Sequence, residues 1–322
     1  MKTVEIADNK NNIVKKHNDI IEAKGKLSET AQKMLAMLIA MIQVDDSEFQ
    51  EYALNIQDYL QRINSDSANV DFLKNKALEL MKNPFYIINE DGKKEYFNWC
   101  SKVAPYKLEG YIVFTIHKDL KPYLLNLKRH FTTYNIVNVM KLKGDYTLRL
   151  YEIFIMKYSE YKHYNKNAKS FTFELNIDEL RNMINIPKSY RYNNIKVQIL
   201  EVAKKQFKEK TDIQFEYKEQ KIGRRVDRLI VTVKDNNKGS NDYLANRRAF
   251  IAYVREKYKP DPTNNIFPTI LDGDLGKIKV DIHGNIYLLK NDGNIEEYSK
   301  DRADKLWSWL YELAQLGNLP GI

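Results

Sequence analysis

Cysteine is almost absent from this chain of 322 residues, which has a single thiol at Cys100. One cysteine excludes an intramolecular disulfide framework and any zinc site built from several thiolates. We therefore expect Cys100 to be a partly buried, structural thiol in a protein that works in a reducing compartment.

Long hydrophobic runs are absent as well. The longest one, Met34–Ile42, is far shorter than the ~20 apolar residues that cross a bilayer. Residues 1–16 mix charges and hold no continuous apolar stretch that could direct secretion. We expect a cytoplasmic protein with no membrane partner. The glycines never form a G-x-x-x-x-G-K-[ST] loop, so we expect no ATP hydrolysis and no cofactor.

Positive charge is concentrated in one part of the chain. Residues 1–140 hold 19 Lys and Arg against 18 Asp and Glu, residues 141–239 hold 22 against 13, and residues 240–322 hold 11 against 12. The net charge of +9 therefore comes from the middle segment. A local basic excess beside a helix-turn-helix pattern is typical of a nucleic-acid-binding domain.

Hydrophobic spacing in residues 1–140 predicts a winged helix behind an arm at 1–12. An N-cap serine, Ser28, precedes apolar residues at helical spacing, and period-two alternation begins at Phe85. We expect helices at 28–42, 56–63 and 67–82, the last ending at Asn83-Pro84, and strands at 52–54, 85–88, 96–99 and 111–116.

The same order of elements recurs in residues 141–238 and predicts a second winged helix, which binds DNA. We expect helices at 148–158, 176–184 and 190–210, the second capped by Asn176 or Asp178 and the third by Ser189, and strands at 171–175, 213–217 and 229–233 around a turn at Gly223.

Residues 239–322 are expected to form a linker and a small accessory domain of mixed helix and strand. Turn signals at 283–285 and 291–293 predict hairpins, and helices are expected at 247–258 and 302–316. The fold class is therefore α+β, with two tandem winged helices and a small α+β C-terminal domain.

The long helix at 190–210 has two faces of different character. Ile195, Ile199, Val202 and Ala203 are expected to face the core, with Gln206 beside them. Residues of the opposite face near the N-terminus can read base edges, since Arg pairs with guanine, Asn with adenine, and Val contacts a thymine methyl. The alternative is a merely solvated face. The base-reading candidates are Arg191, Asn193, Asn194, Lys196 and Val197.

Basic residues outside this set are candidates for phosphate contacts, which position a protein on DNA without reading sequence. Those of the hairpin around Gly223 could instead only keep the hairpin soluble. The pair on the third helix of the first module is offset by Asp71 and Glu79. The phosphate candidates are Lys188, Lys204, Lys208, Lys218, Lys221, Arg224, Arg225 and Arg228, with Lys74 and Lys76 in the first module.

Several segments together resemble the initiator Rep superfamily, the replication initiators of iteron-containing plasmids. They are IVKKHNDIIEA at 13–23, KLSETAQK at 26–33, RLYE at 149–152, the stretch 173–180, Ile186-Pro187, Ser189-Tyr190-Arg191 and KTDI at 210–213. Family members tend to carry a basic run around Lys196, whereas Val197 and Gln198 follow it here.

The resemblance implies two winged helices that bind repeated sites, the iterons, in double-stranded plasmid origin DNA. It further implies origin opening, recruitment of the host replication machinery including its helicase and initiator, a homodimer/monomer equilibrium and repression of the protein's own gene. A winged-helix transcriptional repressor without initiation activity is the alternative function.

A rolling-circle nickase is a more distant alternative, since that enzyme needs a His-hydrophobe-His metal pair and a nucleophilic tyrosine. The five histidines form no such pair. We therefore expect no enzyme, no catalytic residue and no metal.

Overall fold

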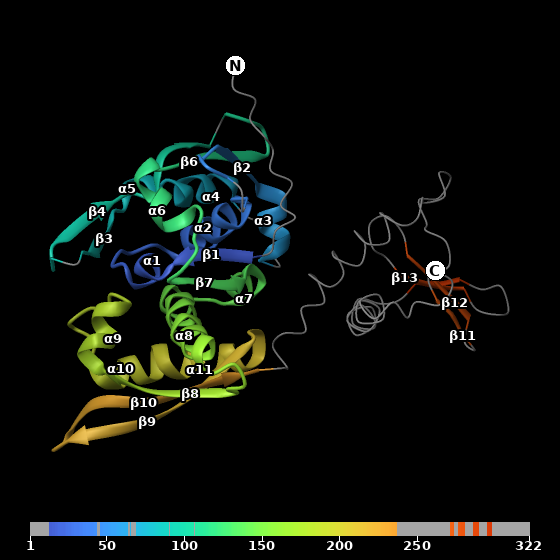
Figure 1. Ribbon diagram of the computed structural model, residues 1–322. Coiled ribbons are helices and arrows are strands. Elements are labelled where there is room, and N and C mark those ends of the chain that lie inside the picture. Colours follow the sequence, from blue (N-terminus) through green and yellow to red (C-terminus); the bar gives the residue numbers. More distant parts are fainter. Residues whose placement is uncertain are drawn as a thin grey trace. The chain divides into compact units, whose positions relative to one another are not determined.

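The structure, a computed structural model, describes residues 13–43, 46–63, 65, 69–89, 91–105 and 107–236, together with the backbone of four strands between residues 271 and 297 (Figure 1). The chain divides into two compact units, Met1–Ser240 and Asn241–Ile322. The boundary expected near residue 140 lies inside the first unit.

The N-terminal part of the first unit, here called the first module (13–141), mixes short strands with helices. Asparagines end two of its strands and cap the helices that follow, since the Asn55 side chain accepts from the Asp58 N–H at 2.9 Å and Asn135 from Val137 at 3.0 Å. Its elements are β1 (Ile13–His17), α1 (Asn18–Glu22), α2 (Glu29–Met41), β2 (Glu51–Asn55), α3 (Ile56–Arg62), α4 (Val70–Ala77), α5 (Glu79–Lys82), β3 (Phe85–Ile88), β4 (Lys94–Phe97), β5 (Cys100–Ala104), β6 (Tyr111–Ile116), the 3₁₀ turn η1 (Lys118–Leu120), α6 (Lys121–Leu124), β7 (Phe131–Asn135) and α7 (Ile136–Lys141).

The second module (145–235) is built around one long helix and a three-stranded sheet. Phe154 of that helix packs edge-on against Phe207 and Phe215, with ring centroids 6.2 and 5.1 Å away, so the core lies between helix and sheet. Its elements are α8 (Asp145–Tyr164), β8 (Ser170–Asn176), α9 (Ile177–Met183), α10 (Tyr192–Ile195), the π-helical turn η2 (Lys196–Leu200), α11 (Glu201–Lys210), β9 (Ile213–Ile222) and β10 (Arg225–Asp235).

Both modules have the same sheet topology. The strand order is β2-β6-β5 in the first and β8-β10-β9 in the second, and all pairs are antiparallel. In each module the first strand follows a helix and the last two strands come after the second and third helices. Two winged helices in tandem were therefore correctly predicted, and the mixture of helix and strand is α+β.

Parts of the first module differ from the prediction. The helix expected at 67–82 is divided at Leu78 into α4 and α5. The strand expected at 96–99 ends at Phe97, and β5 follows it unpredicted. Residues 118–141 form elements for which no local signal was found, because β7 is stabilised by pairing with the distant strand β1, Val14 opposite Tyr134. Cys100 is buried as expected, and burial raises the pKa of its thiol to about 12.

The predicted start of the long helix in the second module is wrong. Ser189 does not cap it; the helix begins at Tyr192, with Arg191 at the N-cap position and no side-chain cap. The residues before it form a turn, since the Tyr190 N–H donates to the Pro187 carbonyl at 3.0 Å.

The predicted core face of this helix is also partly wrong. The π-helical turn η2 has more residues per turn than an α-helix, so it rotates the face of every later residue. Ile195, Ile199, Ala203 and Gln206 are buried as predicted, whereas Val202 is 40% exposed. Leu200 and Phe207 occupy the core instead.

The second unit is described only by four antiparallel strands. They pair in sequence order, β11 (Leu271–Gly273), β12 (Gly276–Val280), β13 (Ile286–Leu289) and β14 (Ile295–Glu297). The turn signals at 283–285 and 291–293 lie between paired strands, as a hairpin requires. The arm at 1–12, most of the linker and the helices expected at 247–258 and 302–316 lie outside the described residues. Within the described part of the chain, no helix is both long and apolar enough to cross a membrane.

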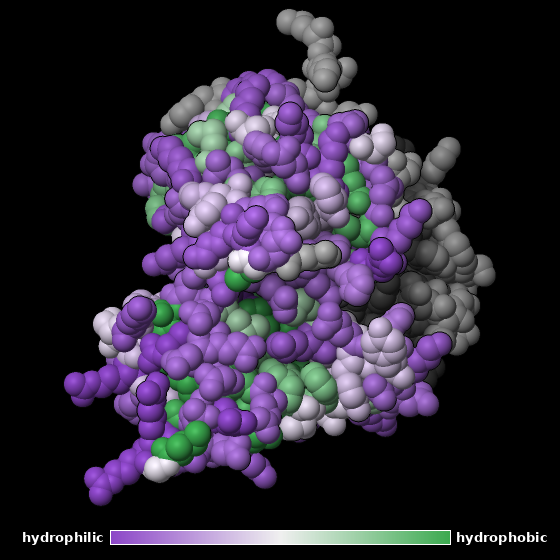
Figure 2. Space-filling model, turned by 60° about the vertical axis from the view of Figure 1, so that its left-hand side comes forward, coloured by the Kyte–Doolittle hydropathy of each residue, from purple (hydrophilic) through white to green (hydrophobic). Residues whose placement is uncertain are grey.

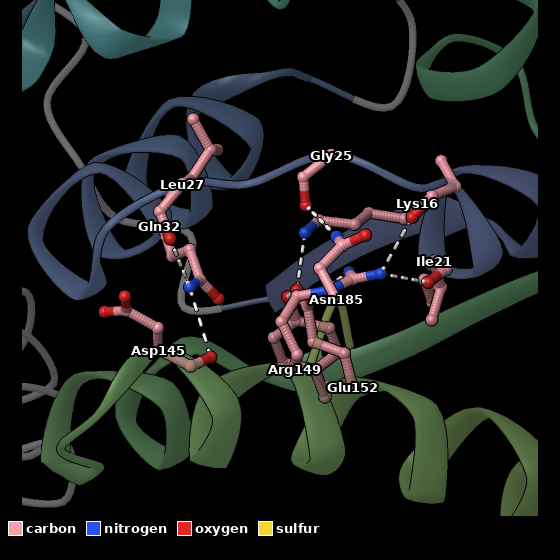
Figure 3. A network of polar contacts seen from close by, with 11 residues as sticks. Lys16, Ile21, Gly25, Leu27, Gln32, Asp145, Arg149, Glu152 and Asn185 are labelled. Carbon is pink, nitrogen blue, oxygen red and sulfur yellow. Dashed lines mark hydrogen bonds and ion pairs between the residues drawn. The ribbon is translucent and has the colours of Figure 1, made fainter. Parts of the chain in front are cut away.

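A buried network of charges joins the two modules (Figure 3). The carboxylate of Glu152 on α8 accepts from Lys16 Nζ of β1 at 2.5 Å, from the Tyr134 hydroxyl of β7 at 2.5 Å, and from Arg149 at 3.0 Å. Arg149 also donates to the carbonyl of Ile21 at 2.8 Å. Strand β1 and helix α1 of the first module are therefore held against α8 of the second module.

Burial opposes ionisation of Glu152, but the charges of Lys16 and Arg149 outweigh it and lower the pKa of the carboxyl to about 2. Burial also lowers the pKa of Lys16, an effect that Glu152 partly offsets. Glu152 is therefore ionised at neutral pH, and removing its carboxylate would leave Lys16 and Arg149 together without their shared acceptor.

The position of η2 predicts different costs for two neighbouring truncations. Leu200→Ala should lower the free energy of unfolding by about 2–5 kcal/mol because it empties a core position. Val202→Ala should change it by about 0.5 kcal/mol or less, because Val202 is 40% exposed and lies outside the core. Urea unfolding followed by circular dichroism measures both. A larger loss for Val202→Ala would mean that the helix is regular and that the original prediction was right.

Replacing the buried carboxylate should be costly. Glu152→Gln should lower the free energy of unfolding by about 3–5 kcal/mol, since it leaves Lys16 and Arg149 without a counter-charge. Glu174→Gln, a matched change on an exposed glutamate, should cost about 1 kcal/mol or less. Equal losses in the two variants would contradict the network.

The same carboxyl predicts the direction of pH dependence. The pKa of Glu152 is about 2 in the folded protein and about 4.3 for an unperturbed glutamate in the unfolded chain. Protonation therefore favours the unfolded state, and stability should fall as pH drops from about 4.3 towards 2. Urea unfolding at several pH values should show a shallower decline in Glu152→Gln than in the native protein.

Candidate nucleic-acid interface

Helix α9, the turn after it and the helix formed by α10, η2 and α11 make a helix-turn-helix. The turn is held by Arg181, whose guanidinium donates to the carbonyls of Pro187 at 3.1 Å and Tyr190 at 2.5 Å. Asn185 adopts a left-handed conformation, φ 55°, that asparagine tolerates better than most residues. These contacts fix the N-terminus of the long helix relative to α9.

The turn is also attached to the first module. The Asn185 side-chain amide donates to the carbonyl of Gly25 at 2.7 Å (Figure 3). A Cβ at Gly25 would lie only 2.5 Å from the Phe85 Cβ, so only glycine fits there. The first module therefore contributes to the position of the helix-turn-helix.

The base-reading candidates lie at the exposed N-terminal end of the long helix. Arg191 and Asn193 are exposed, Asn194 is half-buried, and Val197 is 55% exposed. None of these four side chains has a salt bridge or side-chain hydrogen bond to another described residue. Lys196 differs from them, since its ammonium pairs with Glu219 of β9 at 2.8 Å.

The hairpin of β9 and β10 is the wing of the second module. Its strands are joined by a turn at Gly223, where the sequence predicted one, and Gly223 has the positive φ of 60° that glycine adopts most easily. Lys218, Lys221 and Arg224 are exposed and make no salt bridge to any residue in the described ranges. These cations are available to phosphate groups.

Other phosphate candidates are held by acidic side chains of the same module. Lys204 pairs with Glu216, and Arg228 pairs with Glu174 at 2.7 Å and with Asp227 at 3.1 Å. Arg225 lies 3.7 Å from Asp178, although its side chain is highly exposed. Lys188 and Lys208 are exposed, and neither forms a salt bridge with the residues described.

The two candidates in the first module are on α4. Lys76 pairs with Glu79 at 2.7 Å and lies over the Phe72 ring, and Lys74 lies 4.0 Å from Asp71. The structure thus places them in local ion pairs, apart in sequence from the helix-turn-helix and wing of the second module.

A groove between the modules contains basic residues that the sequence reasoning missed. It has a volume of about 690 Å³ and lies between β3 of the first module and α9 with its following turn. The missed cations are Lys24 and Arg181, and the phosphate candidates Lys188 and Arg225 line the same groove. Lys24 comes to this place because its backbone pairs with that of Tyr86, a contact that no local sequence signal reveals.

The elements that carry these side chains project to one side of the first unit. In Figure 1 the β3–β4 hairpin, α9 with α10, and the tip of the β9–β10 wing all extend to the left. Figure 2 turns this side forward and shows hydrophilic side chains over most of it, with small apolar patches between them. Within the described residues, no group of three or more His, Cys, Asp or Glu could hold a metal ion.

Comparison with known proteins places both modules in one family. Residues 13–155 match the family described as initiator replication protein, WH1, and residues 176–233 match initiator Rep protein, WH2. A replication initiation protein of Escherichia coli is 26% identical over 186 residues, which cover 55% of this chain and 56% of that protein. The chain thus spans about half the length of this curated relative.

A solved structure has the same fold. The crystal structure of the Pi initiator protein in complex with iteron DNA matches 71% of this chain and 99% of that chain, with a TM-score of 0.54 and 17% sequence identity. At this identity the match supports the fold alone. The two family matches together cover more than half of the residues, and the chain belongs to the initiator Rep protein family.

Proposed function

We propose that this protein initiates plasmid replication by binding repeated sites, the iterons, in the double-stranded DNA of the origin. Family membership supports the proposal, as does the name of the relative from Escherichia coli, a replication initiation protein. The similar Pi initiator was crystallised with iteron DNA. The observation that carries the proposal is the set of Arg191, Asn193, Asn194 and Val197 at the start of the long helix. Three of them are exposed and Asn194 is half-buried, and none forms a salt bridge with a residue in the described ranges.

Base reading is assigned to this helix end in the major groove. Arg191 would pair with guanine, Asn193 and Asn194 with adenine, and Val197 would contact a thymine methyl. Lys196 belongs to the set only if DNA displaces Glu219 from its ammonium.

Phosphate contacts are assigned to the wing and the ends of the helix-turn-helix. Lys188, Lys208, Lys218, Lys221, Arg224 and Arg225 would make direct contacts. Lys204 and Arg228 would contribute less, because each must first exchange a carboxylate partner. Lys74 and Lys76 would give a further, weaker set of contacts from the first module.

Initiation requires the bound DNA to open. We infer that several protomers on adjacent repeats bend and untwist A·T-rich DNA, which is deformed at lowest cost at flexible steps. This uses binding energy and assigns the protein no catalytic step, cofactor or metal. The opened strands would then receive the helicase of the host replication machinery, in the cytoplasm where plasmid DNA is found.

We propose that the three segments of the chain have the roles expected from the sequence. Residues 1–140 would support self-association in a homodimer/monomer equilibrium, residues 141–238 would read DNA, and residues 239–322 would be a linker and accessory domain. A dimer on its own promoter would repress the gene.

Sequence reading by the second module can be tested with DNA that flanks the gene. Fluorescence anisotropy on tiled duplexes should show tight binding of the native protein to one repeated tile. The Arg191→Ala/Asn194→Ala variant should bind that tile at least about 30-fold more weakly, since each bidentate pair contributes about 1–3 kcal/mol.

The matched control is Lys166→Ala/Asn167→Ala, which removes the same kinds of group from an exposed turn before β8. Its affinity should equal that of the native protein. Weak and equal binding of every tile, unchanged in the Arg191/Asn194 variant, would mean that the basic segment is only an electrostatic patch.

The salt dependence of DNA binding should distinguish cations that have no acidic partner among the described residues from cations already in salt bridges. Arg224→Ala should reduce the slope of log K against log salt concentration by about 1, the effect of losing one phosphate contact. Lys204→Ala should reduce it less, because Glu216 already neutralises this ammonium. A larger effect of Lys204→Ala would show that the Lys204–Glu216 pair opens on DNA.

Initiation and repression are distinguished by replication itself. A plasmid that carries the gene and its upstream DNA should replicate in a permissive host while the protein is expressed. Binding to a single inverted repeat at the promoter, with no replication, would instead establish the repressor function.

A further inference from the structure

The end of the wing is a free two-stranded ribbon. Strand β8 pairs with β10 only from Arg228 to Lys234, whereas the β9–β10 pairing continues to Ile222 opposite Arg225. Gly223 has a positive φ of 60°, whereas the φ of Arg224 is not positive. This is the pattern of a type II′ turn with two residues in the loop. The ribbon therefore ends in a tight turn with a two-residue loop.

The tip carries an apolar side chain among cations. Ile222 is 66% exposed, and Lys221, Arg224 and Arg225 around it are all exposed. Since Arg225 lies directly opposite Ile222, both side chains leave the same face of the ribbon. The arrangement combines a water-avoiding group with positive charges that attract phosphates.

The wing is tied to the long helix, so the tip has a fixed place relative to the base-reading residues. Lys196 pairs with Glu219, Lys204 with Glu216, and the Tyr217 hydroxyl donates to Glu201 at 2.5 Å. A β-bulge between Val226 and Arg228, at the base of the free ribbon, adds twist and turns the tip.

We infer that Ile222 is a wedge that enters the minor groove beside the major groove occupied by the long helix. There it partly unstacks one base step and bends the duplex, while Lys221, Arg224 and Arg225 hold phosphates on either side. This inference rests on the proposed function, because it needs the long helix to lie in DNA.

Dimensions and chemistry agree with this placement. The minor groove of B-DNA is about 6 Å wide, which admits a single side chain such as Ile222 but not the whole ribbon, whose strand axes alone lie about 4.8 Å apart. Isoleucine is among the side chains that minor-groove proteins insert between base pairs, at steps that kink readily such as TA. A wedge at an A·T-rich flank would also lower the cost of opening the duplex there.

The test measures bending and base stacking together. The probe is the tile that the native protein binds most tightly, or any A·T-rich tile if all bind equally, with a fluorophore pair at its ends and 2-aminopurine in place of one adenine at each TA step in turn. At saturating native protein, end-to-end energy transfer should rise and 2-aminopurine fluorescence should increase several-fold at one step.

Ile222→Ala should lose the 2-aminopurine signal and most of the bend, with less than a tenfold loss of affinity and an unchanged salt slope. Arg224→Ala should lower the salt slope but keep both optical signals at saturation. Tyr164→Ala removes a larger exposed side chain, 84% exposed, at the far end of α8 and should behave like the native protein.

The possible failures are distinguishable. If the native protein binds and bends DNA and Ile222→Ala bends it equally, the wedge is wrong while the proposed function stands. If the native protein binds without bending or unstacking, the wedge is also wrong. If it binds no duplex even at low salt, both the proposed function and the wedge are overturned.

Discussion

The carboxylate of Glu152 is the interaction on which the arrangement of the first unit depends. It lies in the core and accepts from an ammonium, a guanidinium and a phenol that come from β1, α8 and β7. Arg149 also donates hydrogen bonds to the carbonyls of Ile21 and Ala23, and so fixes the chain that follows β1. The next turn of chain brings Gly25 to Asn185 and so fixes the turn of the helix-turn-helix. The buried charges around Glu152 are thus connected through a few direct contacts to the turn that precedes the candidate base-reading residues.

Elements with strong local signals could be predicted from the sequence. Ser28 caps α2, Asn176 caps α9, and Phe171 to Leu175 alternate as β8. The missed elements depend on distant partners. Strand β7 exists because it pairs with β1, and Thr132 and Thr133 weaken its apolar alternation. The π-helical turn η2 could not be found from periodicity either, because the residues before and after it each follow a helical pattern.

The same distinction applies to the candidate site. Exposure of Arg191, Asn193 and Val197 follows from local helix periodicity and was predicted. The ion pairs of Lys196 and Lys204 with Glu219 and Glu216 were not, because helix and wing meet only in the folded module. Lys24 and Arg181 gain their place in the groove through the docking of the two modules. Counting charge along the chain could locate the basic module but could not tell free cations from neutralised ones.

The ties between the long helix and the wing have a consequence for the DNA that such a protein selects. Because helix and wing are linked by three polar contacts, the distance between their tips is set before DNA is bound. An added base pair rotates the flank by about 35° relative to the helix site, since B-DNA has about 10–10.5 base pairs per turn. A base substitution removes one contact, whereas an insertion misaligns every contact beyond it. Iterons read in the proposed way should therefore drift in sequence over evolution while keeping their length.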